Sequence, residues 1–517
     1  MDAADFSDDH SLYITLATCM VLVLSTLLFY RHWISSTGDA VSPYSSEQSR
    51  KLSPFESYYY DLNTQGMEII SYMAFVDSYL PLSLELVTSA ARVLQRRHPL
   101  LKMRVIEDSD SDGASQYFVP MEVVAVDVEE VKSESWEDVH AEEMKTHLNL
   151  SQGPLWRVRL LRDGDQQDGA IHKNIMAVSF AHCMADGNCI MRFLDDLMDV
   201  FCQLSGDDVI NEVSWPLLPP VEDYFPRSKV RPWEKVVIKC HSAIGGLLKR
   251  YWSWKGVVQS IPCFPADVPK SPDIVKETRA LSFHLTMEEV HKLRQNCRKH
   301  GATVNGAVTA AASVAACKIM QGGKLSREQK IHTIFMVNMR HHCEPSLEPD
   351  KSFGFYSSKI KLDVTVRKDG DSRDGFWKLA TECTNQKKEK LRDNGKEAVK
   401  AFKSMSVIRK VFRLTALDVV SSAKSEKCND NRSEYAFAVS NLGDCAYFTK
   451  DKTRIFELVR KVSATSGFNY QPIFCHFVAT FHGKMFWNLA YHTNVCTKSQ
   501  AQEYADATLE ILQMVID

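Results

Sequence analysis

One short segment, His182-Cys183-Met184-Ala185-Asp186-Gly187, combines residue types that can carry out acid–base chemistry. A histidine can act as a base near neutral pH because its ordinary pKa of about 6.5 lies close to the operating range. Asp186 could fix the loop by pairing with a cation, and Gly187 permits a tight backbone that a Cβ would obstruct. We therefore take His182 as a candidate general base. A histidine buried at a strand end with a satisfied hydrogen bond is the alternative for an isolated match.

The residues on either side of this segment predict a strand followed by a helix. Ile175 to Ala181 is a largely apolar run, as expected for a central strand. The apolar residues after the segment recur at helical spacing: Ile190, Phe193, Leu194, Leu197, Phe201 and Leu204. His182 would then lie on a strand-to-helix turn, and such turns place side chains where ligands of α/β proteins usually bind.

Further helices and strands alternate along the chain. Apolar positions from Leu82 to Leu94 predict a helix that Pro99 ends. Residues 156–160 alternate apolar side chains with Arg157 and Arg159, which predicts a half-buried strand. The C-terminal helix is expected to bury one face: Ala501, Tyr504, Ala505, Thr508, Leu512 and Val515.

Length and composition describe a globular protein with two large parts. A chain of 517 residues is too long for one compact core, which favours two lobes. A net charge of -3 gives no reason to expect a nucleic acid as partner. The 14 cysteines are single, and no two have the Cys-x-x-Cys spacing of a zinc site or redox pair. We therefore expect a folded body whose cysteines are reduced thiols and which binds no metal.

The N-terminal segment, residues 1–34, is predicted to carry a membrane anchor. Residues 11–30 contain no charged residue and would reach about 30 Å as a helix, enough to cross a bilayer. Acidic rather than basic residues precede the run, which disfavours a cleaved signal peptide. Arg31 and His32 follow it and predict a single-pass protein whose body faces the cytosol, with the endoplasmic reticulum as one such membrane. A buried core helix is the alternative.

The remaining boundaries follow from composition. Residues 35–51 are expected to be a tether, and residues 52–214 a first lobe that contains the His182 segment. Residues 215–275 hold nine prolines and predict a crossover to a second lobe, residues 276–517.

Five other segments, in this order along the chain, extend the pattern around His182. They are Arg97-His98-Pro99-Leu100-Leu101-Lys102, Gly153-Pro154-Leu155-Trp156-Arg157-Val158, Thr303-Val304-Asn305-Gly306-Ala307-Val308, Val337-Asn338-Met339-Arg340 with Phe353-Gly354-Phe355-Tyr356, and Val439-Ser440-Asn441-Leu442-Gly443. Together with the His-x-x-x-Asp-Gly motif, they resemble the coenzyme A-dependent acyltransferase superfamily with the chloramphenicol acetyltransferase fold. That superfamily includes condensation domains, plant BAHD acyltransferases, alcohol acetyltransferases and bacterial wax ester synthases. The resemblance covers nearly everything after residue 52.

The resemblance implies an α/β protein of two chloramphenicol acetyltransferase-like lobes with a tunnel between them and His182 at its midpoint. The acyl donor and the acceptor would enter from opposite sides, with no covalent acyl-enzyme, no permanently bound cofactor and no metal. Acyl-CoA would be a co-substrate. Ser440 or Asn441 would stabilise the oxyanion, unless these residues form only a turn between two strands.

The sequence also departs from the superfamily pattern. Members with two consecutive histidines have the first where this chain has Ala181. Lys102 replaces the arginine that braces the motif aspartate in condensation domains, so we expect Arg340 to pair with Asp186 instead. The plant "DFGWG" segment is absent.

The resulting prediction is an O-acyltransferase that moves an acyl group from acyl-CoA to a hydroxyl acceptor. The anchor suggests that this alcohol could be lipophilic, because a tether raises local access to partitioned substrates. Two alternatives stay open: an amide-forming N-acyltransferase with an amine acceptor, and a non-catalytic binding member that kept the tunnel and lost turnover.

Overall fold

The structure is a computed structural model, and most of the folded body can be described. The described residues are 48–108, 115–162, 167–168, 170–206, 213–225, 277–410, 435–449, 454–467, 472 and 474–517. The predicted anchor at 11–30 and most of the predicted crossover lie outside them. Across the described part of the chain, no single helix combines the length and apolar character of a membrane span. The helices Met287–Lys299 and Val304–Met320 do so only together, bent by 97°.

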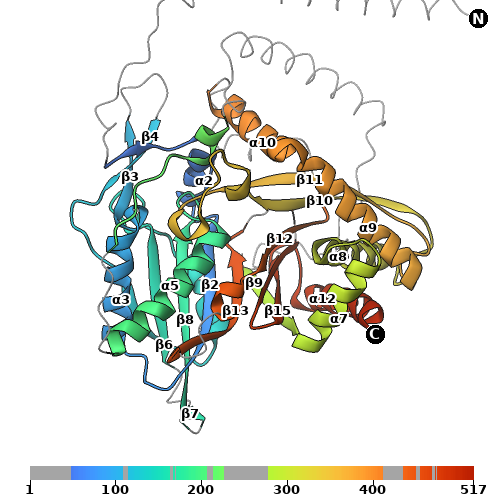
Figure 1. Cartoon of the computed structure of the whole chain (residues 1–517), viewed down its shortest axis with the longest axis horizontal. Helices are drawn as coiled ribbons and strands as arrows, with labels where there is room; N and C mark the ends of the chain where they lie inside the picture. Colours follow the sequence, from blue (N-terminus) through green and yellow to red (C-terminus); the bar gives the residue numbers. More distant parts are fainter. Residues whose placement is uncertain are drawn as a thin grey trace, which may run out of the picture.

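The first half of the chain builds a mixed sheet covered on both faces (Figure 1). Its strand order is β13 (Phe456–Thr465), β2 (Ile69–Ser78), β8 (Ile171–Ala181), β6 (Trp156–Arg162) and β5 (Val128–Lys132), with the short β7 (Gln167–Asp168) paired to β8. Among the described strands of this sheet, only β5 and β6 pair in parallel. The helices packed against it are α3 (Leu84–Arg97), α5 (Gly187–Ser205) and α4 (Trp136–Lys145).

A small sheet lies beside the first one. It consists of β1 (Arg50–Lys51), β4 (Ser115–Pro120) and β3 (Met103–Asp108). The folded body therefore begins before residue 52, because the last residues of the predicted tether at 35–51 are already paired as β1. Next along the chain comes α2 (Pro54–Asn63), which begins at a capping box formed by Ser53 and Glu56.

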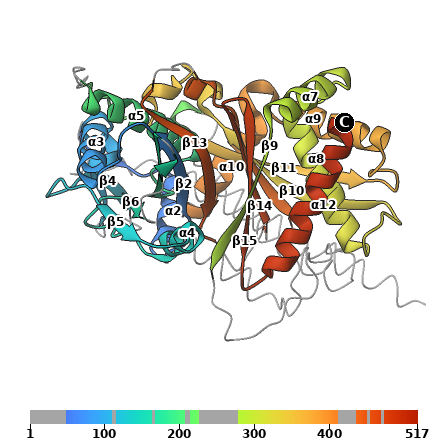
Figure 2. The ribbon, with the colours of Figure 1, turned by 90° about the horizontal axis from the view of Figure 1, so that it is seen from below.

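Four helices of the second half, Met287–Lys299, Val304–Met320, Arg373–Lys390 and Lys498–Ile516, lie on one side of the second sheet, as Figure 2 shows. Its strand order is β11 (Ser357–Val366), β10 (Gln329–Asn338), β12 (Phe437–Asp444), β14 (Phe474–Phe481), β15 (Lys484–His492) and β9 (Thr278–Leu285). The helices of this half are α7 (Met287–Lys299), α8 (Val304–Met320), α9 (Arg373–Lys390), α10 (Arg392–Lys410) and α12 (Lys498–Ile516). The short 3-10 helices of the body are Pro99–Lys102, Val221–Tyr224, Arg340–His342, Pro349–Lys351 and Ala446–Thr449.

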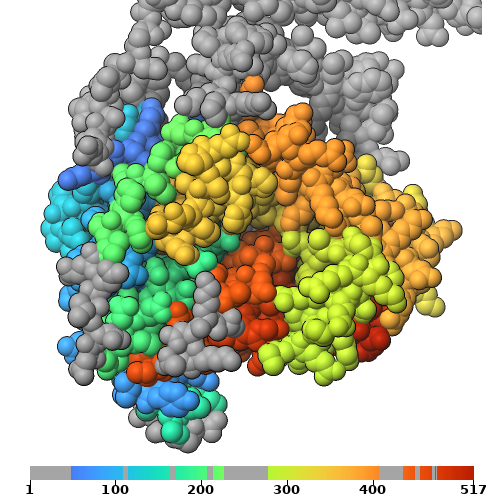
Figure 3. Space-filling view, viewed as in Figure 1, coloured from blue at the N-terminus to red at the C-terminus, as the bar shows by residue number. Residues whose placement is uncertain are grey.

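Strand β13 joins the two halves. It comes from the part of the sequence assigned to the second lobe, yet it pairs antiparallel with β2 at the edge of the first sheet, with Ser463 opposite Tyr72. The division at residues 276–517 missed this exchange, because a strand's apolar pattern does not say which sheet completes its hydrogen bonds. In Figure 3, orange-red residues from the last part of the chain lie at the surface between the green and yellow-green halves.

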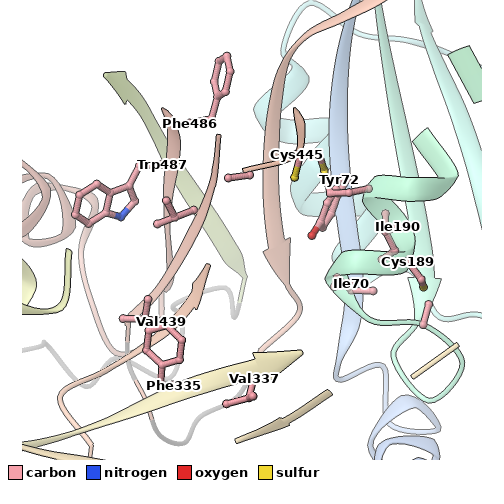
Figure 4. Packing of buried hydrophobic residues seen from close by; sticks show 14 of the residues in the cluster. Ile70, Tyr72, Cys189, Ile190, Phe335, Val337, Val439, Cys445, Phe486 and Trp487 are labelled. Atoms are coloured by element: carbon pink, nitrogen blue, oxygen red, sulfur yellow. The ribbon is translucent and has the colours of Figure 1, made fainter. Parts of the chain in front are cut away.

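The core between the two sheets is continuous. Figure 4 shows Tyr72 close to the first turns of α5 on one side and Phe486 and Trp487 of β15 on the other. Helix α8 packs closely because its side chains are small, and a Cβ on Gly306 would approach the carbonyl oxygen of Ala380 to 2.4 Å.

Several predicted elements are confirmed: the helix ending before Pro99 is α3, the central strand is β8, and the helix after the motif is α5. All six residues predicted for the buried face of α12 are buried. The half-buried strand β6 differs from expectation, because Arg157 is only 2% exposed. Its Nε donates to Glu143 of α4 at 2.6 Å. Helix α4 therefore covers the face of β6 that the two arginines predicted to be exposed to solvent.

Candidate active site

The His182 segment lies on a strand-to-helix turn. Ala181 ends β8, and α5 begins at Gly187 with Asp186 as its N-cap. Oδ1 of Asp186 accepts the backbone N–H of Cys189 at 3.0 Å, which satisfies one of the free donors of the first helical turn. The capping role explains why an aspartate stands at this place in the segment.

The imidazole of His182 is held in one tautomer. Its Nδ1 lies 2.8 Å from the carbonyl oxygen of Ala185, which can only accept, so Nδ1 carries the proton and Nε2 keeps its lone pair. The side chain is 8% exposed. Burial lowers its pKa, although the Ala185 carbonyl and the charge of Asp186 act in the opposite direction. The ring is therefore a neutral base at pH 7.

Two aromatic rings enclose His182 from different parts of the sequence. The centroid of Tyr59 in α2 lies 4.6 Å from that of the imidazole, and the centroid of Phe355, just before β11, lies 5.4 Å from it. Tyr59 and Phe355 also contact each other, with centroids 4.9 Å apart. His182 thus lies where the two halves of the chain meet.

The backbone around His182 is fixed from the α2–β2 connection. The N–H of His182 donates to the carbonyl oxygen of Glu68 at 3.2 Å, and the N–H of Cys183 donates to Oδ1 of Asn63 at 3.2 Å. Nδ2 of Asn63 donates to the carbonyl of Glu68 at 2.7 Å. The start of the turn is therefore fixed independently of its end at Asp186.

Asp186 is a structural anion with every oxygen occupied. Oδ2 accepts from Nη1 of Arg340 at 2.8 Å, from the N–H of Tyr356 at 2.8 Å and from Oγ of Ser357 at 3.2 Å. Burial alone would raise the pKa of the carboxyl, but Arg340 and these hydrogen bonds hold it below its usual range. Asp186 therefore fixes the turn, and among the described residues it forms no hydrogen bond with the imidazole of His182.

Arg340 is the partner of Asp186, as the resemblance to the acyltransferase superfamily predicted. The side chain is 1% exposed, and its Nε and Nη2 donate to Ser352 and to the carbonyl oxygen of Gly354 at 3.0 to 3.3 Å. Lys102 ends the 3-10 helix Pro99–Lys102 and forms no hydrogen bond or ion pair with Asp186 within the described residues. A planar guanidinium can satisfy several fixed acceptors at once, which a lysine cannot.

Gly187 is the only residue type that fits at its position, because neighbouring side chains leave no room for a Cβ. A Cβ at this position would lie 2.8 Å from Oη of Tyr72 and 3.2 Å from Cδ2 of Leu442. Tyr72 belongs to β2 and Leu442 to β12, so strands of both sheets press on the first residue of α5. The expectation that a Cβ would be obstructed at Gly187 is confirmed, and the obstructing atoms belong to the side chains of Tyr72 and Leu442.

Ser440 and Asn441 lie in β12, which reaches the motif through their neighbour Leu442. The amide of Asn441 is engaged: Nδ2 donates to the side chain of Asn305 in α8, and Oδ1 accepts the N–H of Gly443 at 2.7 Å. Neither residue forms a hydrogen bond with His182 within the described residues. A cavity of about 240 Å³ lies beside this turn, lined in part by Asn305, Asn441, Gly443 and Arg294.

No motif in the sequence marks Glu68 or the two aromatic residues that enclose His182. Phe355 lay within a matched segment but had no assigned role, and Tyr59 lay in a run of three tyrosines with no chemical motif. The positive φ of Glu68, at 58°, has no sequence signal at all. In the part of the chain that can be described, no group of three or more His, Cys, Asp or Glu side chains could hold a metal ion.

A family model described as alcohol acetyltransferase matches residues 129–516. Two curated proteins are similar over less than half of the chain: nonribosomal peptide synthetase kk1B of Curvularia clavata, 25% identical over 234 residues (45% of this chain), and nonribosomal peptide synthetase dtxS1 of Metarhizium robertsii, 24% identical over 228 residues (43%). The matched regions span only 2% and 3% of those proteins.

Solved structures share the fold over nearly the whole chain. The trichothecene 15-O-acetyltransferase TRI3 of Fusarium sporotrichioides has a TM-score of 0.64 at 14% identity and covers 93% of this chain and 100% of its own. The epimerization domain from the third module of tyrocidine synthetase B gives 0.57 at 14% identity, covering 91% and 99%. The condensation domain of the monacolin K polyketide synthase MokA gives 0.56 at 12% identity, covering 90% and 97%.

Proposed function

Because this chain belongs to the alcohol acetyltransferase family, we propose that it moves an acyl group from acyl-CoA to the hydroxyl of an alcohol, with His182 as the general base. The observation that carries the proposal is the hydrogen bond from Nδ1 of His182 to the carbonyl of Ala185. It leaves a basic Nε2 on a buried, neutral ring where the two halves meet.

In the proposed reaction, Nε2 removes the proton of the acceptor hydroxyl as the oxygen attacks the thioester carbonyl carbon. The new C–O bond forms, and the carbonyl oxygen takes the negative charge. As the carbonyl re-forms, the C–S bond breaks and Nε2 returns the proton to the departing thiolate sulfur. The products are an ester and free CoA, and no acyl-enzyme forms. The aromatic rings of Tyr59 and Phe355 would exclude water from the base.

For the oxyanion we propose Ser440 over Asn441. The amide nitrogen of Asn441 already donates to Asn305, so using it would break an existing hydrogen bond. The hydroxyl of Ser440 is half-buried, and it precedes the Leu442 contact with Gly187 by only two residues. We also propose that the acyl donor and acceptor reach His182 from opposite sides of a tunnel between the lobes.

The proposal is tested with the full-length chain in detergent, a panel of acyl-CoAs and alcohols, and measurement of free thiol and ester mass. His182→Ala should lower thiol release by at least about a hundredfold, as expected for loss of a general base. His291→Ala removes an exposed histidine of α7 and serves as the matched control. Equal thiol release by His182→Ala and wild type would exclude the mechanism.

Two other activities remain distinguishable in the same assay. Similarity to condensation domains favours an amine acceptor as the second candidate, which would give an amide by the same proton transfers. A non-catalytic binding member would bind acyl-CoA without releasing thiol from any acceptor pair.

We further propose that residues 11–30 anchor the chain in a membrane with its body in the cytosol, and that the acceptor is lipophilic. Protease added to sealed microsomes should digest the body. Protection of the body would reverse the proposed orientation.

A further inference from the structure

Glu68 is the residue of the α2–β2 connection whose backbone is fixed on both sides. Its N–H donates to the carbonyl of Ser466, after β13, at 3.0 Å, and its own carbonyl accepts from His182 and Asn63. Its φ of 58° lies in the left-handed region, which a residue with a Cβ seldom adopts. Strain of this kind persists where the surroundings impose it, and it is most common at functional sites.

The carboxyl of Glu68 has unused hydrogen-bonding capacity. In the described part of the chain it forms no hydrogen bond or ion pair, whereas the carboxyl of Asp186 accepts four hydrogen bonds. The residue is nevertheless only partly exposed. Its oxygens are not among the fully buried unpaired side-chain atoms of the described residues, so they are accessible to a donor from outside the chain.

The surroundings of this carboxyl belong to both halves of the molecule. When ionised, the carboxyl of Glu68 raises the pKa of the hydroxyls of Tyr58 and Tyr59 and of the thiol of Cys475 in β14. Lys359 of β11 in turn lowers the pKa of Glu68. Tyr59 is the ring that lies 4.6 Å from the imidazole of His182. The carboxyl is therefore linked to His182 through Tyr59, the tyrosine that contacts the imidazole.

Glu68 suits an acceptor better than a donor. The phosphates of CoA are anionic and need a cationic partner, which Glu68 cannot supply, whereas a hydroxyl group needs no charge. Burial raises the pKa of Glu68 to about 8, against a smaller opposing effect of Lys359, so the group is largely a neutral acid at pH 7. A neutral carboxyl both donates and accepts, which complements a hydroxyl group better than an ammonium group.

We propose that Glu68 binds a second hydroxyl of the acceptor, one that is not acylated, so that the enzyme selects polyols over simple alcohols. This inference rests on the proposed alcohol acyltransferase function. It assigns Glu68 a role in specificity, separate from the proton transfers at His182.

The test compares hexanol with the matching vicinal hexanediol, using acetyl-CoA as donor. Wild type should prefer the diol in kcat/KM, and Glu68→Leu should reduce that preference by about tenfold or more, mainly through KM. Glu68→Gln keeps a donor and an acceptor of similar shape and should restore part of the preference. Glu510→Gln, at an exposed position of α12, is the matched control and should behave as wild type.

A binding measurement separates this inference from the proposed function. Calorimetry with His182→Ala protein, which cannot turn over by the proposed mechanism, should give tighter binding of hexanediol than of hexanol, and adding Glu68→Leu should remove the difference. Equal binding of the two probes before Glu68 is changed, or an unchanged difference after it, overturns the inference. If wild type acylates neither alcohol, the proposed function fails while the binding comparison still decides the role of Glu68.

Discussion

Nη1 of Arg340 lies 2.8 Å from Oδ2 of Asp186, and each side chain is only 1% exposed. The two residues are 154 positions apart in the chain, and one belongs to each half. The ion pair therefore ties the strand-to-helix turn of the first half to the β10–β11 connection of the second. Charges buried this deeply are compensated only by each other and by fixed hydrogen bonds.

Replacing Asp186 by Asn should destabilise the protein more than it alters the imidazole. Arg340 would remain buried without its anion, and the free energy of unfolding should fall by about 3–5 kcal/mol. Asp350→Asn removes a surface ion pair, in which Asp350 is 70% exposed and lies 2.8 Å from Arg192, so it should cost less than about 1 kcal/mol. Denaturant unfolding measures the free energy of unfolding of both variants. Equal losses would show that the buried pair of Asp186 and Arg340 stabilises the fold no more than the surface pair does.

A methyl group at Gly187 should disturb the motif through a steric contact. Gly187→Ala would bring a Cβ to 2.8 Å from Oη of Tyr72, and should cost about 1–3 kcal/mol together with most of the activity. Adding Tyr72→Phe removes that oxygen and should restore part of both. Gly206→Ala, whose Cβ would meet only a carbonyl oxygen at 3.5 Å, is the control. A double variant no better than Gly187→Ala would contradict the steric explanation.

The acid limb of the pH profile of kcat/KM should reflect the lowered pKa of His182. Burial lowers the pKa of His182, so the imidazole stays neutral, and active as a base, below the value of about 6.5 typical of an exposed histidine. We expect kcat/KM to stay level as the pH falls through 6.5 and to decline only at more acidic pH. NMR titration of the ring, assigned by comparison with His182→Ala, should give the same midpoint, and a midpoint above 6.5 would contradict this reading of the site.

Lys461 of β13 should be a residue whose removal stabilises the fold. Its ammonium is fully buried, lies 4.9 Å from the centroid of the Tyr72 ring and donates to Oγ of Ser463 at 2.8 Å, with no ion-pair partner among the described residues. Burial lowers its pKa to about 8 from 10.5. Lys461→Met keeps the length without the charge and should raise the free energy of unfolding by about 1–3 kcal/mol at pH 7.

The pH dependence of this gain follows from the sign of the shift. Between about pH 8 and 10.5 the unfolded chain holds a proton that the folded protein has lost, so wild-type stability gains a rising contribution from Lys461 as the pH increases. The advantage of Lys461→Met should therefore be largest below pH 8 and vanish above 10.5. Unfolding of both proteins at pH 7 and pH 10 measures it, and an advantage that grows at pH 10 would be incompatible with a buried cation.

Local sequence patterns predicted the strand and the helix that carry the motif. They did not predict which distant segments contact each other. The apolar run before His182 and the helical spacing after it are properties of neighbouring residues, and β8 and α5 match them. Contacts such as those of Phe355 with His182 depend on how distant segments dock. The same holds for Arg157, whose burial requires Glu143 from a helix that a strand pattern does not reveal.

The pairing of Arg340 with Asp186 could be foreseen because a resemblance supplied information about distant contacts that one sequence lacks. The role that we propose for Glu68 could not be foreseen, because it is argued from an unusual backbone angle and from a carboxyl with no hydrogen-bond partner among the described residues rather than from a motif.

The pairing of β13 with β2 also governs how the chain can fold during synthesis. The ribosome must deliver residue 465 before the edge of β2 receives its partner, although β2 itself was completed almost four hundred residues earlier. Until then the nascent chain displays an open strand edge of the kind that recruits other chains. We expect newly made protein to need chaperones through most of translation, and premature stop codons before residue 456 to yield aggregates rather than a smaller folded domain.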